Sequence, residues 1–244
     1  MPHEPSKSGI VLDQSYPFDF SPPEFTHPEF SHSGPPQQTA VPKFQLTDAV
    51  RPGPCCPVYP VEGYRREIWK GPRGERVPLL AISVSREKIL DLFLDLLEPL
   101  GSSVDIILES SHGPDGNPTP SGRSGRDLTR RNMDRPIFSS NCLDFEDLLL
   151  NDGCTGISVI SSRARNKGLI REVQLDEHKT LIVYSEKLVS FLRVLKAHGL
   201  HRIDSMKLLL EGDHLHRSSS RHLEEFERFS MLMGADGPQE AASF

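Results

Sequence analysis

Histidines and carboxylates gather most densely near the end of the chain, in Glu211-Gly212-Asp213-His214-Leu215-His216, and His222 follows six residues later. On a β-strand, residues two apart project to one face, so the imidazoles of His214 and His216 would lie together. Zinc and other divalent ions accept imidazole and carboxylate ligands. We therefore treat Asp213, His214, His216 and His222 as a candidate metal site. On a helix the two rings would diverge and could not share a metal. The alternative is a polar connection from a strand to a helix, in which Asp213 or Ser218–Ser220 serve as helix caps.

A Glu-x-x-His pair occurs twice, as Glu109 with His112 and as Glu211 with His214. Each pair follows a predicted strand. A carboxylate and an imidazole can act together as base and acid, so the four side chains form a candidate catalytic site if the two segments converge. The alternative is that these residues lie at strand ends because strand ends meet water. Nothing in the sequence sets the distance between the two pairs.

An arginine-rich segment spans residues 113–136, where glycine, proline and serine argue against regular structure. Arg123, Arg126, Arg130 and Arg131 are candidate anion-binding residues. No aromatic residue alternates with these arginines, which disfavours base stacking, and the net charge of −6 disfavours general binding to phosphate backbones. Binding of an anion or RNA is thus the third functional hypothesis, and a solvated loop is the simpler interpretation.

The first 57 residues have the composition of a disordered tail, and 13 of the 21 prolines lie within residues 1–60. Two similar pentapeptides, residues 23–27 and 28–32, follow one another. Phenylalanines spaced through an extended, proline-rich segment could dock in the groove of a partner protein. The candidate partner-binding residues are Phe18, Phe20, Phe25 and Phe30. The alternatives are a low-complexity expansion without a partner, or a start codon placed too far upstream.

Several classes of protein are disfavoured by what the sequence lacks. The chain has no glycine-rich nucleotide-binding motif, no HExxH and no GxSxG. Its four cysteines include no CxxC pair and are expected to be free thiols. No apolar run approaches the ~20 residues of a membrane-spanning helix, and the N-terminus has no signal-peptide pattern. We therefore expect a cytoplasmic protein without a membrane partner.

Hydrophobic periodicity predicts a mixture of strands and helices after the tail. The predicted strands are residues 66–70, 77–84, 104–108, 156–161, 170–175, 180–184 and 206–210. The predicted helices are residues 86–98, 143–151, 186–198 and 220–233.

The two halves of this region, residues 58–112 and 154–214, resemble each other, since each reads strand, strand, helix, strand. We expect an α+β fold with one mixed β-sheet built from two such halves, helices packed on the sheet, and a C-terminal helix. The single domain would span residues 58–234, with the arginine-rich loop 113–136 between its halves and a disordered end at 235–244. Any two amphipathic segments of this kind look similar, so a true duplication stays one of two interpretations.

The absence of a catalytic signature makes a non-enzymatic interaction or regulatory module the first functional hypothesis, with the tail docking on a protein partner. An exposed sheet edge could also support a homodimer. The second hypothesis is a small metal-dependent hydrolase that uses His214, His216 and His222 with a divalent metal.

Overall fold

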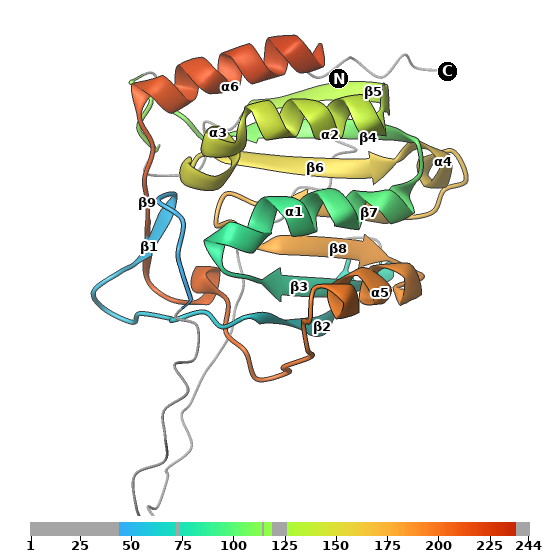
Figure 1. Ribbon diagram of the computed structural model, residues 1–244, viewed down its shortest axis with the longest axis horizontal. Helices are drawn as coiled ribbons and strands as arrows, with labels where there is room; N and C mark the ends of the chain where they lie inside the picture. Colours follow the sequence, from blue (N-terminus) through green and yellow to red (C-terminus); the bar gives the residue numbers. More distant parts are fainter. Residues whose placement is uncertain (1–43, 72–73, 114, 119–125, 238–244) are drawn as a thin grey trace, which may run out of the picture. The chain divides into compact units, whose positions relative to one another are not determined.

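One antiparallel sheet of seven strands organises the chain in this computed structural model, which describes residues 44–71, 74–113, 115–118 and 126–237 (Figure 1). The order across the sheet is β2 (Gly63–Lys70), β3 (Arg76–Ser83), β8 (Leu181–Ser185), β7 (Arg171–Leu175), β6 (Thr155–Ser161), β4 (Ser103–Ser110) and β5 (Arg126–Asp134). A separate two-stranded sheet pairs β1 (Val50–Pro52) with β9 (His214–His216).

Helices cover one face of the large sheet (Figure 1). They are α1 (Arg86–Leu97), α2 (Arg135–Asp144), α3 (Glu146–Asn151) and α5 (Val189–Ala197), with α6 (Ser220–Met233) packed against α2 and α3. The short α4 (Ser162–Arg165) follows β6, and single 3₁₀ turns lie at η1 (Glu98–Leu100) and η2 (Leu209–Glu211). Helix α1 carries the chain from β3 to β4, past the three strands that separate them.

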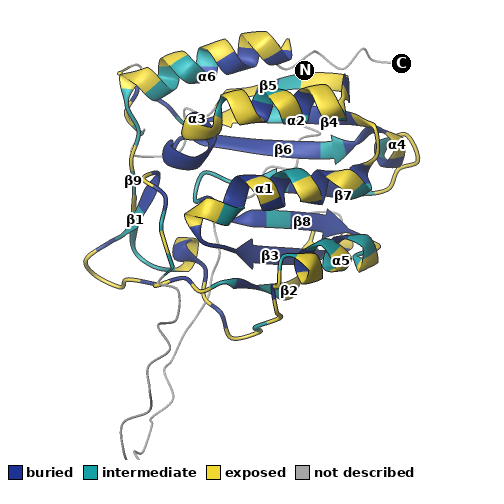
Figure 2. Ribbon diagram, viewed as in Figure 1, coloured by how far each residue is buried: buried dark blue, intermediate teal, exposed yellow. Residues whose placement is uncertain are grey.

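The main core lies between this helical layer and the sheet (Figure 2). Alternation along each strand decides which residues enter it. In β6, for example, Ile157 and Val159 belong to the core, whereas Ser158 faces the opposite side. Phe93 of α1 and Phe191 of α5 are fully buried in the same cluster.

A smaller apolar cluster covers part of the opposite face, over β3 and β8. Met206 and Leu208 pack there against residues such as Leu79 and Tyr184. We expected residues 206–210 to form a strand, and that prediction is wrong, because this segment has no strand pairing and ends in η2. The alternating apolar residues of this segment pack on one face of the sheet and do not add a strand to it.

The predicted α+β class, with helices on a sheet and a C-terminal helix, is confirmed. The sheet is antiparallel between all its described neighbours, so the mixed sheet was wrong in that detail. The first half reads strand, strand, helix, strand as expected, but the second half lacks its closing strand. The arginine-rich segment was expected to be a loop to residue 136, yet residues 126–134 form β5. The helix predicted at 143–151 covers the last two residues of α2 and the whole of α3, and the earlier part of α2 was missed.

Order also begins earlier and ends later than predicted. Residues 44–57 were assigned to the tail, yet they include β1 and the fully buried Ala49. At the other end, Ala235 is buried, and Asp236 pairs with Thr129 of β5. The tail phenylalanines and residues 238–244 lie outside the described residues. No helix in the described ranges is long and apolar enough to cross a membrane.

Helix α5 offers a matched test of the core. Phe191 is fully buried, whereas Val189, two residues earlier, is 63% exposed. We expect Phe191→Ala to lower the free energy of unfolding by about 3–5 kcal/mol, because it leaves a cavity between helix and sheet. Val189→Ala should change it by less than about 0.5 kcal/mol. Urea unfolding of the two variants measures both effects, and equal losses would contradict this placement of α5.

Candidate metal centre

Strand β9 presents two imidazoles to one side. His214 and His216 are its first and last residues, and Leu215 between them is exposed. The strand is held by its antiparallel pairing with β1, in which Val50 lies opposite His216 and Pro52 opposite His214. The expectation that these two histidines occupy a strand and share a face is therefore met by the geometry.

A third imidazole, that of His178, comes from the turn between β7 and β8. Asp176 shapes this turn, because its Oδ1 accepts a hydrogen bond of 2.8 Å from the Thr180 N–H. The turn closes through the Lys179 N–H, which donates to the Asp176 carbonyl at 2.9 Å, and Lys179 has a left-handed φ of 63°. The same Asp176 carboxylate lies 3.1 Å from Nδ1 of His178 and so also orients the ring.

The three rings form one compact cluster, which we call the histidine cluster: His178, His214 and His216. Their centroids are 4.7 to 5.1 Å apart. One ligand atom from each residue lies within 4.8 Å of those of the other two. Nε2 of His178 and Nε2 of His214 are 3.1 Å apart. All three residues are partly exposed, so the cluster reaches the protein surface.

Hydrogen bonds at Nδ1 determine where the ring protons lie. Nδ1 of His214 is 2.8 Å from the Gly212 carbonyl, and Nδ1 of His216 is 2.6 Å from the Gly153 carbonyl. A carbonyl oxygen only accepts, so both Nδ1 atoms must carry the proton. Nδ1 of His178 likewise donates to Asp176. In the neutral rings, each Nε2 is therefore left with a free lone pair.

Burial and neighbouring charges shift the pKa values of two of these rings in different directions. Burial lowers the pKa of His178, but the Asp176 and Glu177 carboxylates outweigh this effect and raise that pKa above its ordinary value. Burial lowers the pKa of His216, and the positive charge that His178 and His214 can carry lowers it further. The Gly153 carbonyl and Glu177 oppose that shift without reversing it.

Behind the histidine cluster lies a buried carboxylate, that of Asp152, which has no exposed surface. Its Oδ2 is 3.0 Å from Nε2 of His112 and accepts a hydrogen bond of 2.5 Å from the Thr155 hydroxyl. The ammonium of Lys179, also buried, donates to the Thr155 carbonyl at 2.8 Å. Burial raises the pKa of Asp152, but His112 and Lys179 more than compensate and bring it to about 2.

The same network contains a serine, a histidine and an aspartate in series. The Ser110 hydroxyl is 2.8 Å from Nδ1 of His112, whose Nε2 faces Asp152. This order is that of a nucleophile, a base and an orienting carboxylate. However, Ser110 is only 5% exposed and faces the core side of β4, so no substrate reaches its hydroxyl. The arrangement is consequently structural.

The backbone around Gly153 joins the buried network of Asp152 to the histidine cluster. Asp152 belongs to the buried network, and Gly153 next to it accepts the hydrogen bond from His216. Gly153 also donates its N–H to the Arg217 carbonyl at 2.8 Å, just after β9. The buried charges therefore hold the backbone that orients one ring of the histidine cluster.

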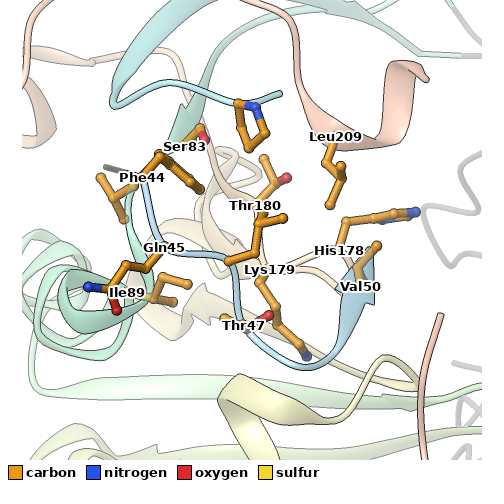
Figure 3. A pocket seen from close by; sticks show the side chains of 13 residues that line it. Phe44, Gln45, Thr47, Val50, Ser83, Ile89, His178, Lys179, Thr180 and Leu209 are labelled. Carbon is orange, nitrogen blue, oxygen red and sulfur yellow. The ribbon is translucent and has the colours of Figure 1, made fainter. Parts of the chain in front are cut away.

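A small pocket lies beside the turn that carries His178, and Phe44, Gln45, Val50, Ile89 and Leu209 are among its lining residues (Figure 3). In Figure 3 the imidazole of His178 points away from the side chains of Phe44, Gln45 and Ile89. The pocket therefore lies on the other side of this residue from its ring nitrogens, and it is not the opening of the histidine cluster.

Comparisons with family models, curated proteins and solved structures find no match to this chain. Its function has to be inferred from its own residues.

The structure separates the four predicted metal ligands into three sets. His214 and His216 belong to the histidine cluster, whereas His222 lies on α6, 3.8 Å from Asp152 and 3.9 Å from Asp147. Asp213 accepts a hydrogen bond from the Cys55 N–H at 3.0 Å. It is not part of the histidine cluster.

The two Glu-x-x-His pairs each find separate partners. Glu109 accepts from the Ser158 hydroxyl at 3.3 Å, on the face of the sheet without helices. There, burial and the nearby Asp127 carboxylate raise its pKa to about 7. His112 contacts Asp152 as described. Glu211 forms a bidentate pair with Arg65, at 2.7 and 2.8 Å, and caps η2 through the Leu208 N–H. These contacts do not join the four residues, so the expected convergence is not observed.

The candidate anion-binding arginines lie on β5 where they are described. Arg126 pairs with Glu227 at 2.5 Å and lies over the ring of Phe226. Arg130 and Arg131 are exposed on the same strand, and Arg123 lies outside the described residues. Neither the arginines nor the tail phenylalanines form part of the histidine cluster.

Sequence reasoning missed His178 and Asp152. Residues 176–179 connect the predicted strands 170–175 and 180–184 and carried no functional prediction, and 36 positions separate His178 from His214. The one available signal was the composition of that turn, in which a histidine lies between two acidic residues and a lysine. Asp152 carried no signal, because it follows an amphipathic helix where a polar residue is ordinary.

The buried carboxylate makes stability depend on pH. The pKa of Asp152 is lower in the folded state than in the unfolded chain, so its contribution is complete above about pH 5 and is lost as the pH falls toward 2. We expect Asp152→Asn to lower the free energy of unfolding at pH 7 by about 2 kcal/mol. Urea unfolding at pH 7 and pH 2.5, with exposed Asp204→Asn as the control, measures this. A loss of equal size at both pH values would contradict it.

The close approach of Gly153 to the residue just before β1 predicts a steric effect. A Cβ at this position would lie 2.3 Å from the Ala49 carbonyl oxygen and 3.0 Å from the Arg217 backbone nitrogen. We expect Gly153→Ala to displace the β1–β9 pair and to destabilise the protein by about 1–3 kcal/mol. Gly237→Ala, where a Cβ meets nothing within 4 Å, is the matched control. Thermal unfolding that is the same for both variants would show that the close approach does not exist.

Proposed function

We propose that this protein binds zinc, or a similar divalent transition metal, at His178, His214 and His216. The observation that carries the proposal is the direction of the three rings. Each Nδ1 donates to an oxygen of the protein, so each Nε2 lone pair is available to one shared ligand.

The spacing of the nitrogens suits a metal of this size. Two nitrogens that bind one tetrahedral zinc at about 2.05 Å lie about 3.3 Å from each other. Nε2 of His178 and Nε2 of His214 are 3.1 Å apart, and one ring nitrogen of each of the three histidines lies within 4.8 Å of those of the other two. A small movement of the His216 ring would therefore complete three ligands of a tetrahedron.

Electrostatics also favours a cation between the rings. When both rings are neutral, the contact between His178 and His214 brings two lone pairs together, which is repulsive. Either a metal ion or an additional proton on one ring removes this repulsion. The carboxylate of Asp176 stabilises either positive charge, that of the metal ion or that of a protonated ring. The zinc titration described below distinguishes the two.

The hydrogen-bond partners of the rings are of the kind that surround metal-binding histidines. Such a histidine usually donates its other ring N–H to a carboxylate or a backbone carbonyl, which fixes its tautomer and orientation. Asp176 does this for His178, the Gly212 carbonyl for His214, and the Gly153 carbonyl for His216. All three ligands therefore have this support.

The docking role of the tail remains a prediction about residues outside the described ranges. The hydrolase hypothesis of the sequence analysis is retained in a changed form, with His178 in place of His222. Metal binding is proposed first because contacts among described side chains support it directly.

Isothermal titration with zinc tests the proposal. We expect one zinc per chain, and we expect His178→Ala, His214→Ala and His216→Ala each to weaken binding by more than the roughly 10–100-fold that losing a single hydrogen-bond partner of a ligand costs. His201→Ala and His222→Ala are the controls, and both should bind as the wild type does.

Absence of zinc binding in the wild-type protein would overturn the proposal. In that case the close contact of His178 with His214 is a histidine pair that shares a proton. Loss of binding in His222→Ala comparable to that in His214→Ala would instead restore the metal site first predicted from the sequence.

A further inference from the structure

Strand β2 is one edge of the large sheet (Figure 1), and most of its outer side is unpaired among the described residues. Only Tyr64 has outer partners there. Its N–H donates to the His201 carbonyl at 3.1 Å, and its carbonyl accepts from the Ile203 N–H at 2.8 Å. On a strand, the N–H and C=O of one residue point to the same side, and this side alternates along the chain. The same groups of every second residue after Tyr64 therefore also point outward.

These outward groups belong to Arg66, Ile68 and Lys70, and no described residue is bonded to them. The pairing of β2 with β3 has no bulge, so the groups are evenly spaced over residues 66–70. The opposite edge of the sheet differs, because Thr129 in β5 exchanges two backbone hydrogen bonds with Asp236, of 2.7 and 3.1 Å. The edge of β2 is thus an uninterrupted template for another strand.

The side chains of the same three residues lie on one face. Tyr64 packs against the main core, so the even-numbered residues of β2 face the helical side of the sheet. Arg66, Ile68 and Lys70 are all exposed, and Ile68 is 46% exposed. Neither cation forms an ion pair within the described ranges. The edge therefore presents a cation, an apolar residue and a second cation in a row.

A second copy of β2 does not fit this edge. Two copies would pair antiparallel about a twofold axis. The register that pairs the whole of residues 66–70 with itself is centred on Ile68, and it puts Arg66 opposite Lys70 on both sides of the axis. Like charges directly opposite each other destabilise a strand pair. Registers shifted toward either end pair fewer of the outward groups.

An acidic strand does fit. A strand that pairs antiparallel with residues 66–70 places one residue opposite Ile68, and the residues two positions away lie opposite Arg66 and Lys70. Carboxylates at these two positions would meet the unpaired cations, and a β-branched residue between them would cover Ile68. The net charge of −6 does not prevent this, because charges beyond about 8–10 Å are largely screened at physiological ionic strength.

We propose that the edge of β2 binds an extended acidic segment of a partner protein, which joins the seven-stranded sheet as a further antiparallel strand. Backbone hydrogen bonds to Arg66, Ile68 and Lys70 provide the affinity, and the side chains of these residues provide the specificity, as is usual for strand addition. The inference is independent of the proposed zinc site, which belongs to β9 and the β7–β8 turn.

Backbone methylation of a peptide tests the added strand. The probe is fluorescein-labelled Thr-Glu-Thr-Val-Thr-Glu-Thr-amide, and its fluorescence polarisation is measured during titration with the full chain. We expect saturable binding. Methylation of the valine nitrogen removes an N–H that faces β2 and should weaken binding roughly tenfold. Methylation of the neighbouring threonine nitrogen, which faces away from the sheet, is the control and should leave the affinity nearly unchanged.

Charge reversal tests the two cations. A chain with both Arg66→Glu and Lys70→Glu should bind the acidic peptide at least roughly fivefold more weakly, because two attractions become two repulsions. The same chain should prefer a peptide with lysine in place of both glutamates. Arg163→Glu with Lys167→Glu makes an equal change in net charge at exposed positions of α4 and the turn after it. This control should bind the acidic peptide as the wild type does.

Three results would overturn the inference. Without binding to the wild-type chain, Arg66 and Lys70 only protect the edge from pairing. If the two methyl groups weaken binding equally, the peptide does not pair with the backbone of β2, and this result needs no variant of the protein. If the wild-type chain is a dimer in size-exclusion chromatography and the charge reversal dissociates it, the edge binds a second copy instead.

Discussion

A carboxylate without exposed surface has to be neutralised where it lies, and the arrangement around Asp152 follows from this constraint. Its partners come from different parts of the chain: His112 follows β4, Thr155 begins β6, and Lys179 belongs to the β7–β8 turn. Removing one charge from such a buried set leaves the others uncompensated. The network therefore holds three connections together at one end of the sheet.

The histidine cluster is a consequence of this packing. Because Lys179 must enter the interior, the turn that carries it is fixed in a left-handed conformation, and the preceding residue, His178, is directed to the outside. The backbone next to Asp152 provides the carbonyl of Gly153 that orients His216. Two of the three rings are thus positioned by elements that the buried charges hold. The third, His214, depends on the pairing of β9 with β1, which explains why residues 44–57 belong to the ordered domain and not to the tail.

Local pattern was sufficient for much of the fold. The buried strand β3, the amphipathic α1, the β7–β8 hairpin and the C-terminal helix each carry their signal in neighbouring residues. The HxH spacing was likewise enough to predict that His214 and His216 share a face. The failures concern long-range contacts. Residues 206–210 alternate like a strand, but Met206 and Leu208 bury their side chains on a finished sheet. Residues 126–134 form the edge strand β5, but they were included in the predicted loop because of the glycine, proline and serine that precede them in the segment 113–136. The choice of His178 over His222 as the third ring depends on tertiary packing, which no spacing rule contains.

The fold fixes the tautomer of each ring in the histidine cluster. A histidine whose Nδ1 faces solvent can exchange its proton between the two nitrogens, so its Nε2 is a free acceptor only part of the time. In the histidine cluster each Nδ1 has an acceptor that the fold supplies, and two of these are carbonyls that cannot donate in return. The tautomer of each ring is therefore set before any ligand arrives, and much of the entropy of ordering the rings is already lost during folding. A site prepared in this way binds a cation with only a small movement of the His216 ring, and the three carbonyl and carboxylate acceptors contribute to its affinity by holding the imidazoles in place.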